Sequence, residues 1–179
     1  MQIITPPGDT SYVYLIRPQA PMQEGKEPQY ACTFVWPEGE KKLAKLKAAI
    51  LEVAEGKWGK KAKQMLEKGQ LRSPLRLGND AYPDKEEFAD TEFLTARSTD
   101  KPETVDRDAE PVMDNTEVYS GMLARGDLYL FAYDKAGNRG VGAILNSVQK
   151  LGDGERKSGR RSARDAFGDD LSDEEVDLL

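Results

Sequence analysis

Histidine is absent from the 179 residues of this chain, and cysteine occurs once, as Cys32. These two absences exclude zinc sites of the usual Cys/His kinds, and they exclude Ser-His-Asp and Cys-His catalysis. A lone cysteine also excludes an internal disulfide and fits a reducing cytoplasm. The phosphate-cradling sequence G-x-x-x-x-G-K-S/T does not occur. The remaining catalytic option is Mg²⁺ held by carboxylates.

Long apolar runs are missing as well. Hydrophobic residues make up 38% of the chain, and no run approaches the roughly 20 residues that span a bilayer. The opening "MQIITPPGDT" lacks the basic start and apolar stretch of a signal peptide. We therefore expect no membrane association, and one domain with appendages.

Charge is distributed unevenly along the chain. The net charge is -6, but residues 165–179 hold seven acids and no base, which leaves 26 bases against 25 acids elsewhere. Residues 41–76 carry eleven bases and three acids, and residues 150–164 carry six bases and two acids. The sequence thus predicts basic zones and one acidic end.

Two N-terminal segments alternate as strands do. In "TSYVYLIRP" (residues 10–18), Tyr12, Tyr14 and Ile16 share one face; in "PQYACTFVWP" (residues 28–37), Cys32, Phe34 and Trp36 share one face. From residue 40 to 55 the apolar period becomes helical, with a stop expected at Gly56, and a shorter helix is expected up to Gly69. Residues 70–90 are expected to be irregular.

Three further strands are expected after this insert. They are "TEFLTARS" (91–98), "EVYSGMLARGDLYLFAYD" (117–134) and "RGVGAILNSVQKL" (139–151), with the turn "DKAGN" between the last two and a short edge strand in "KPETVD". The fold class is therefore mainly β with inserted helices (α+β). Five strands that bend at glycines suit an OB-fold barrel with a helical insert between strands 2 and 3, although spacing alone leaves an SH3-like barrel or a sandwich open.

The C-terminal end reads as a tail. We expect a domain over residues 1–151, with the helical insert at 40–69, and a disordered basic-then-acidic tail over 152–179. Within "DDLSDEEVDLL", Ser172 and Glu175 have capping-box spacing, and Leu171 and Val176 the spacing of a hydrophobic staple. The tail is either a partner-binding segment or a solubilising one. Its candidate partner-binding residues are Asp169, Asp170, Asp173, Glu174, Glu175, Asp177, Leu178 and Leu179.

Aromatic residues on strands beside basic residues are typical of proteins that hold single-stranded nucleic acid, because bases stack on rings and cations follow the phosphates. Each aromatic residue could instead be a core residue, and the lysines could form an ordinary solvent-exposed helix face. Arg97 is the sharpest candidate, because it shares a strand face with Phe93. The candidates for DNA binding are Tyr12, Tyr14, Trp36, Tyr82, Phe93, Tyr119, Lys57, Lys60, Lys61, Arg76, Arg97, Arg125 and Arg139; Tyr129, Tyr133 and Arg72 are considered with them.

Carboxylates cluster between residues 80 and 92, which raises the alternative of a metal-dependent nuclease. Their spacing matches no recognised site, so we interpret the cluster as a solvated loop. We expect no metal, no cofactor and no enzymatic activity.

"FLTARSTDKPETVD", followed by "VYSGMLARGDLYLFAYDKAGNRGVGAILNSVQKLGDGE", resembles the single-stranded-DNA-binding proteins of tailed bacteriophages, which are OB-fold proteins with acidic C-terminal tails. The resemblance covers residues 91–155 closely and the two N-terminal strands more loosely. It implies an OB barrel, no enzymatic activity and a role in coating exposed strands during phage DNA replication and recombination. It extends residue by residue only to Arg97, Tyr119, Arg125 and the tail acids.

The resemblance further implies that the acidic tail recruits replication proteins, such as DNA polymerase or helicase, and competes with DNA for the basic cleft. The expected location is the cytoplasm of the infected bacterial host, and a homodimer is considered. The hypothesis is thus a sequence-nonspecific single-stranded-DNA-binding protein. The alternative is a protein-interaction module that binds a host protein without DNA.

Overall fold

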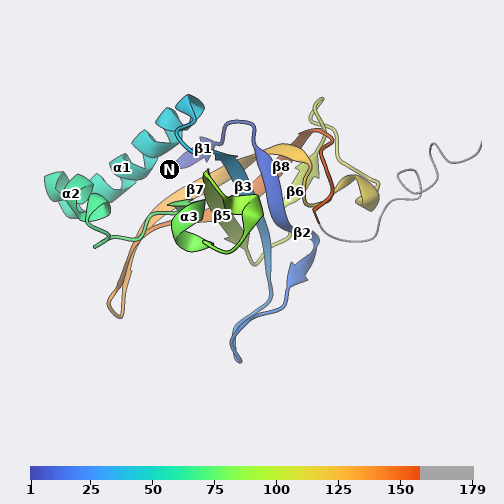
Figure 1. Ribbon diagram of the computed structural model, residues 1–179. Helices are drawn as coiled ribbons and strands as arrows, with labels where there is room; N and C mark the ends of the chain where they lie inside the picture. Colours follow the sequence, from blue (N-terminus) through green and yellow to red (C-terminus); the bar gives the residue numbers. More distant parts are fainter. Residues whose placement is uncertain (158–179) are drawn as a thin grey trace, which may run out of the picture.

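The computed structural model describes residues 1–157, which form a curved β-sheet with a helical insert on one face and a shorter helical stretch packed on Phe93 on the other (Figure 1). Eight strands belong to this sheet, in the order β1-β7-β8-β5-β3-β2, with β4 attached to β5 and β6 to β8. Their bounds are β1 Gln2–Ile4, β2 Asp9–Gln19, β3 Gln29–Pro37, β4 Leu75–Leu77, β5 Thr91–Ser98, β6 Glu103–Val105, β7 Leu123–Lys135 and β8 Asn138–Gly152. The expected mainly β fold with a helical insert is confirmed.

The two ends of the sheet are consecutive in the chain. β1 and β2 are joined by residues 5–8, and this connection bonds to β7 through Thr5 N–H to the Gly126 carbonyl and Gly8 N–H to the Ala124 carbonyl, both 2.9 Å. Within residues 1–157 no ladder joins β1 to β2, so the sheet curls strongly without closing as the predicted five-stranded barrel would. The short edge strand predicted in "KPETVD" is β6, whereas β1 and β4, which also have three residues each, are too short for an alternation to register in the sequence.

The inward face of the sheet packs on the helical insert. η1 (Lys41–Leu43) leads into α1 (Ala44–Trp58), and η2 (Gly59–Lys61) into α2 (Ala62–Glu67). Leu46, Ile50 and Ala54 of α1 join Phe34, Leu94 and Leu128 of the sheet in one buried cluster. This is the apolar stripe that the helical period predicted.

The boundaries of the insert differ from the prediction. α1 continues past Gly56 and ends at Gly59, whose φ of 67° lies in the left-handed region. A glycine inside a helix weakens it but need not end it, whereas the left-handed cap requires glycine far more strongly. The stretch expected to be irregular holds β4, α3 (Gly78–Ala81) and η3 (Glu86–Phe88).

Two long hairpins project from the body in Figure 1, one between β2 and β3 and one between β7 and β8. The β7–β8 hairpin turns at Ala136 and Gly137, both with positive φ, as the "DKAGN" turn predicted. The strand expected from residue 117 begins only at Leu123, because Gly121 takes a φ of 107° and the preceding residues form η4 (Asn115–Glu117) and a turn. No helix in the described part of the chain has the length and apolar character needed to cross a membrane.

Candidate nucleic-acid interface

β5 separates the core from the candidate site by simple alternation. Leu94 and Ala96 are fully buried in the main core. Phe93, Thr95 and Arg97 point to the outer face, as the strand pattern predicted. The outer face of β5 is therefore the place to look for a binding surface.

A groove of about 840 Å³ lies on this face, between β5, β8 and the segment after α2. Three arginines line it, together with two tyrosines that are half-buried, and none of the described residues that line it is acidic. The polar and aromatic side chains concerned are Arg72, Arg76, Arg97, Tyr82, Tyr133, Phe93 and Thr95. The groove therefore unites Arg76, Tyr82, Phe93 and Arg97 of the predicted set.

Arg76 is held in place by Phe93. β4 pairs with β5 so that these two residues are direct partners, and the Arg76 guanidinium carbon lies 5.6 Å from the centre of the Phe93 ring. Phe93 is only 2% exposed. The prediction that Phe93 offers its ring to a base is therefore wrong for this structure: its ring is packed in a core and supports a cation instead.

A cluster of rings adjoins the groove at Tyr82. The Phe88 ring packs on Tyr12, Tyr82 and Phe93 with ring centres 6.1, 4.7 and 5.1 Å away. The ammonium of Lys85 lies 4.7 Å from the centres of both tyrosine rings. Its hydrogen bond to the Tyr12 hydroxyl raises the pKa of Lys85 above its ordinary value. Tyr12 and Tyr82 thus form a half-exposed aromatic surface with a fixed positive charge.

Arg97 connects the groove to a second hollow. The guanidinium donates to the Gln19 side-chain oxygen at 2.9 Å. It also lines a hollow of about 630 Å³ under the β2–β3 hairpin, together with Lys26. Tyr14 lies in the same cross-strand row as Arg97, with the small Ala31 between them. The predicted residue Tyr14 therefore belongs to this continuous outer face.

Trp36 does not. It is 2% exposed in the main core, and its indole N–H donates to the carbonyls of Pro6 and Pro7 at 3.3 and 3.1 Å. The prediction that Trp36 stacks on a base is wrong for this structure. The even alternation of β3 places Trp36 with Cys32 and Phe34 on the inward face, which faces α1.

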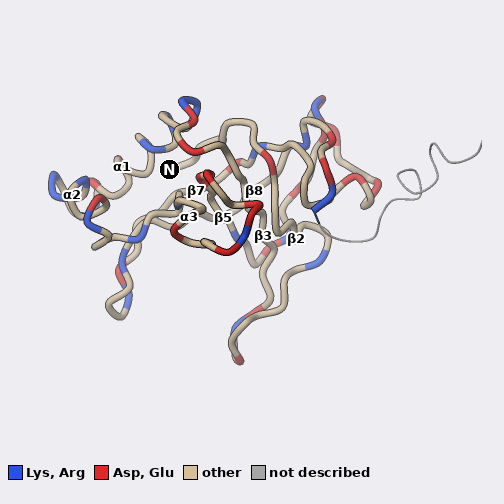
Figure 2. Tube along the Cα trace, viewed as in Figure 1, with Lys and Arg blue, Asp and Glu red and all other residues tan. Residues whose placement is uncertain are grey.

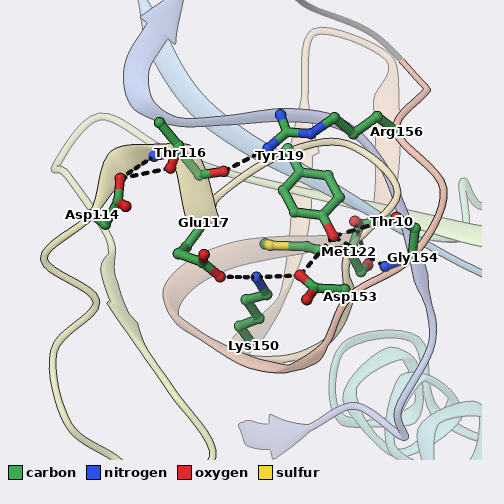
Figure 3. A network of polar contacts seen from close by, with 10 residues as sticks. All are labelled: Thr10, Asp114, Thr116, Glu117, Tyr119, Met122, Lys150, Asp153, Gly154 and Arg156. Carbon is green, nitrogen blue, oxygen red and sulfur yellow. Dashed lines mark hydrogen bonds and ion pairs between the residues drawn. The ribbon is translucent and has the colours of Figure 1, made fainter. Parts of the chain in front are cut away.

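Tyr119 and Arg125 lie outside the groove. The Tyr119 hydroxyl donates to the Asp153 carboxylate at 2.8 Å, and the Arg156 guanidinium lies 4.2 Å from its ring centre (Figure 3). Arg125 donates through Nε to the Gln149 side-chain oxygen at 2.7 Å. Both residues are engaged in structural contacts, and the groove does not bring them together with Arg97.

The network around Tyr119 anchors the end of the described chain. Lys150 is largely buried and contacts the carboxylates of Glu117 and Asp153 at 2.7 and 2.8 Å (Figure 3). Hydrogen bonds from Lys150 and Tyr119 hold the pKa of Asp153 below its usual 3.8. Lys157 N–H then donates to the Ser120 carbonyl at 3.0 Å. Residues 153–157 are thus attached to the body, beyond the residue where we expected the tail to begin.

The other predicted cations are exposed. Lys57, Lys60 and Lys61 lie at the junction of α1 and α2, and none of them is among the groove-lining residues of the described chain. Arg139 lies near the tip of the β7–β8 hairpin, and its Nε donates to the Gln70 carbonyl at 3.3 Å, next to the groove residue Arg72. Figure 2 shows Lys and Arg along α1 and α2, and Asp and Glu on the stretch that follows α3. The helical cations form a separate basic surface.

Within residues 1–157, no three Cys, Asp or Glu side chains are grouped so that they could hold a metal ion. Glu92, part of the acidic run, is bound by Lys47 at 2.8 Å. The tail residues Asp169, Asp170, Asp173, Glu174, Glu175, Asp177, Leu178 and Leu179 lie outside the described residues.

The sequence did not single out Lys85, Phe88 or Gln19. Lys85 and Phe88 occur in "YPDKEEF", whose acids dominate its composition, and no periodicity marks them. The only signal was the aromatic pair Tyr82 and Phe88 at a spacing of six, which has no meaning outside a regular element. Lys85 and Phe88 reach the aromatic cluster because their loop folds back onto Tyr12, and no local sequence pattern encodes this long-range contact.

Comparison with known proteins places this geometry in context. The family model described as the single-stranded-DNA-binding protein of Enterobacter phage Enc34 matches residues 1–179. Protein p50 of Acyrthosiphon pisum secondary endosymbiont phage 1 is 30% identical over 156 residues, which is 84% of each chain.

Two solved structures share the fold. The bacteriophage Enc34 single-stranded-DNA-binding protein in complex with single-stranded DNA has a TM-score of 0.69 at 20% identity, over 88% of this chain and 89% of that one. The gp2.5 single-stranded-DNA-binding protein of bacteriophage T7 has a TM-score of 0.63 at 13% identity, over 90% and 98%.

Proposed function

This chain belongs to the family of the Enterobacter phage Enc34 single-stranded-DNA-binding protein, and we propose that it binds single-stranded DNA along the groove on the outer face of β5. The family and the relatives' printed descriptions support the ligand. The groove supports the proposed location of the binding site.

The observation that carries the proposal is the charge of the groove. Arg72, Arg76 and Arg97 line it, and no carboxylate accompanies them among the described lining residues. Arginine is well suited to phosphate, because its planar guanidinium presents several donors at once. Packing on Phe93 and bonding to Gln19 hold two of these guanidiniums in place before any ligand arrives. Such preorganisation lowers the entropy lost on binding.

The half-buried tyrosines provide the surfaces on which bases stack. Tyr82 and Tyr133 line the groove, and Tyr12 and Tyr14 continue the outer face beyond it. Stacking on such rings contributes about 1–3 kcal/mol per base and is tolerant of sequence. Phosphate contacts carry no sequence information either. The site therefore favours binding that does not discriminate between sequences.

We further propose a biological role for the chain and for its C-terminal tail. The protein coats and protects exposed strands during phage DNA replication and recombination in the host cytoplasm, and it has no enzymatic activity. Residues 1–151 form the binding domain. We assign residues 152–179 to a tail, of which residues 153–157 are attached to the body, and its acids recruit replication proteins, such as a polymerase or helicase, and compete with DNA for the groove. A homodimer belongs to the same set of proposals. The tail's charge and the family resemblance support these roles.

A binding assay with matched variants tests the placement of the site. Fluorescence anisotropy of a labelled oligothymidylate of about 16 nucleotides is measured with the full chain, with the double variant Arg76→Met/Arg97→Met, and with Arg107→Met. Arg107 is exposed and lies outside the groove.

We expect the full chain and Arg107→Met to bind alike and the double variant to bind at least about tenfold more weakly. Equal binding by all three would move the site away from the groove. No binding by the full chain would favour the protein-interaction alternative, and Mg²⁺-dependent fragmentation of the oligonucleotide would favour a nuclease.

A further inference from the structure

The outer face of β7 carries aromatic residues at three successive outward positions. Tyr129, Phe131 and Tyr133 point outward, while the neighbouring Leu128 and Leu130 are buried in the core. Tyr129 is 44% exposed. Large rings left open to water on a regular strand mark a contact surface more often than a single exposed side chain would.

The facing strand has no side chain opposite two of these rings. Across the β7–β8 ladder, Phe131 is opposite Gly142 and Tyr133 is opposite Gly140. A Cβ on Gly142 would lie 2.6 Å from the tip of the Phe131 ring, so this ring lies across the glycine. The centres of the Phe131 and Tyr133 rings are 6.1 Å apart. Phe131 and Tyr133 therefore face glycines, and Tyr129 faces the exposed Ile144; we define the aromatic strip as Tyr129, Phe131 and Tyr133.

The strip adjoins the groove along its length. In one cross-strand row, Tyr129 is opposite Ile144, and Ile144 is opposite Arg97. In another, Tyr133 is opposite Gly140, which bridges to Arg72. Both arginines, Tyr133 and Gly142 itself line the groove. One end of the strip is thus beside Arg97 and the other beside Arg72.

We propose that this aromatic strip is a second base-stacking surface, over which a single-stranded nucleic acid continues from the groove onto the β7–β8 hairpin. The inference rests on the proposed function. Nucleic acid is the occupant that fits, because the strip is flanked by the groove's guanidiniums at both ends. Alternate residues of a strand are about 6.7 Å apart. This is about twice the 3.4 Å rise of stacked bases, which suits an unstacked, extended strand.

The test compares Tyr129→Ala with Leu123→Ala. Leu123 is on the same strand and has the same exposed fraction, 44%, but lies six residues from Tyr129 and outside the groove. Affinity is measured for oligothymidylates of increasing length, from about 4 to about 16 nucleotides. We expect Tyr129→Ala to bind the longer oligonucleotides about 5- to 100-fold more weakly. The shortest ones fill only the groove and should bind as tightly as to the full chain. Leu123→Ala should behave as the unchanged protein at every length.

A second variant, Gly142→Ala, alters the strip without removing an aromatic ring. Gly142→Ala displaces Phe131 and should weaken binding of the long oligonucleotides several-fold. Because Gly142 also lines the groove, the length dependence that isolates the strip is taken from Tyr129→Ala. Gly56→Ala, where an added Cβ meets nothing within 4 Å, is its control. Thermal melting monitors folding of each variant, and loss confined to long oligonucleotides cannot come from unfolding, which would affect all lengths.

The outcomes separate the strip from the groove. If Tyr129→Ala and Gly142→Ala bind all lengths normally while Arg76→Met/Arg97→Met does not, the strip is wrong and the groove stands. If the unchanged protein binds no oligonucleotide, the proposed function fails first and the strip with it. If Tyr129→Ala leaves DNA binding intact but lowers the sedimentation coefficient, the strip is a contact between copies of the chain and the inference is overturned.

Discussion

The Arg76 guanidinium carbon lies 5.6 Å from the centre of the buried Phe93 ring, and the two residues are direct partners between β4 and β5. The ring thus orients a cation that faces the groove. The sequence predicted that Phe93 and Arg97 share a strand face; in the structure the Phe93 ring supports Arg76 of the neighbouring strand instead.

Phe93→Leu tests this support. The substitution changes the shape of the ring cluster and should cost about 1 kcal/mol of unfolding free energy. It should also weaken oligonucleotide binding a few-fold, because Arg76 loses the ring that orients it. Val35→Ala is the control: Val35 is in the same cluster but holds no cation. It should lower the denaturation midpoint and leave affinity unchanged. Equal affinity of Phe93→Leu and the unchanged protein would show that Arg76 needs no support.

Trp36→Phe should affect stability alone. The variant keeps an aromatic side chain in the core but loses the indole N–H that bonds the Pro6 and Pro7 carbonyls. We expect a loss of about 1–2 kcal/mol in urea unfolding and unchanged affinity for DNA. A variant with normal stability and much weaker DNA binding would contradict the buried position of Trp36.

Asp153→Asn should give a pH-dependent loss of stability. The pKa of Asp153 is lowered in the folded chain by hydrogen bonds from Lys150 and Tyr119. A lowered pKa stabilises the fold above the unfolded-state value, and the stabilisation is lost as the pH falls through the folded-state value. The melting temperature of Asp153→Asn should therefore be lower than that of the unchanged protein near neutral pH, and the difference should shrink as the pH falls below the usual 3.8 and through the folded-state pKa. Asp84→Asn, on the exposed loop after Tyr82, is the control. A difference that grows in acid would have the wrong sign.

Truncation after Arg164 tests the tail. It removes seven acids and no base. If the tail competes with DNA for the groove, the truncated protein should bind an oligonucleotide as tightly as the full chain or more tightly at low salt, because a competing polyanion is gone. Weaker binding by the truncated protein would rule out the competition.

Much of the fold was readable because the long elements have clear periods. The strand predicted at 91–98 is β5 with the same bounds, and the strands at 10–18 and 28–37 agree with β2 and β3 within a residue. In β5, alternation separates the main core from the outer face correctly, whereas β3 is buried on both faces from Ala31 to Trp36. Of the three-residue strands, β6 falls in the short edge strand predicted in "KPETVD", whereas β1 and β4 left no pattern in the sequence. The end of α1 was misplaced because Gly56 and Gly59 look alike until the backbone conformation is known.

The site residues could be predicted only where their position depends on a single segment of the chain. Arg97 followed from the alternation of β5, and Arg76 from the basic zone. The partnership of Arg76 with Phe93 depends on β4, and the position of Lys85 between two tyrosines depends on a loop that returns to β2. Trp36 was misjudged because either face of an apolar strand can carry the core, and the choice depends on where α1 packs.

Salt dependence of binding is the most direct test of the central claim. Affinity for a short oligothymidylate is measured over a series of salt concentrations. If the three groove arginines contact phosphates, log affinity should fall linearly with log salt, with a slope of about -0.7 for each phosphate contact. The slope should become shallower in Arg76→Met/Arg97→Met. Binding that does not change with salt, or no binding at all, would contradict the account.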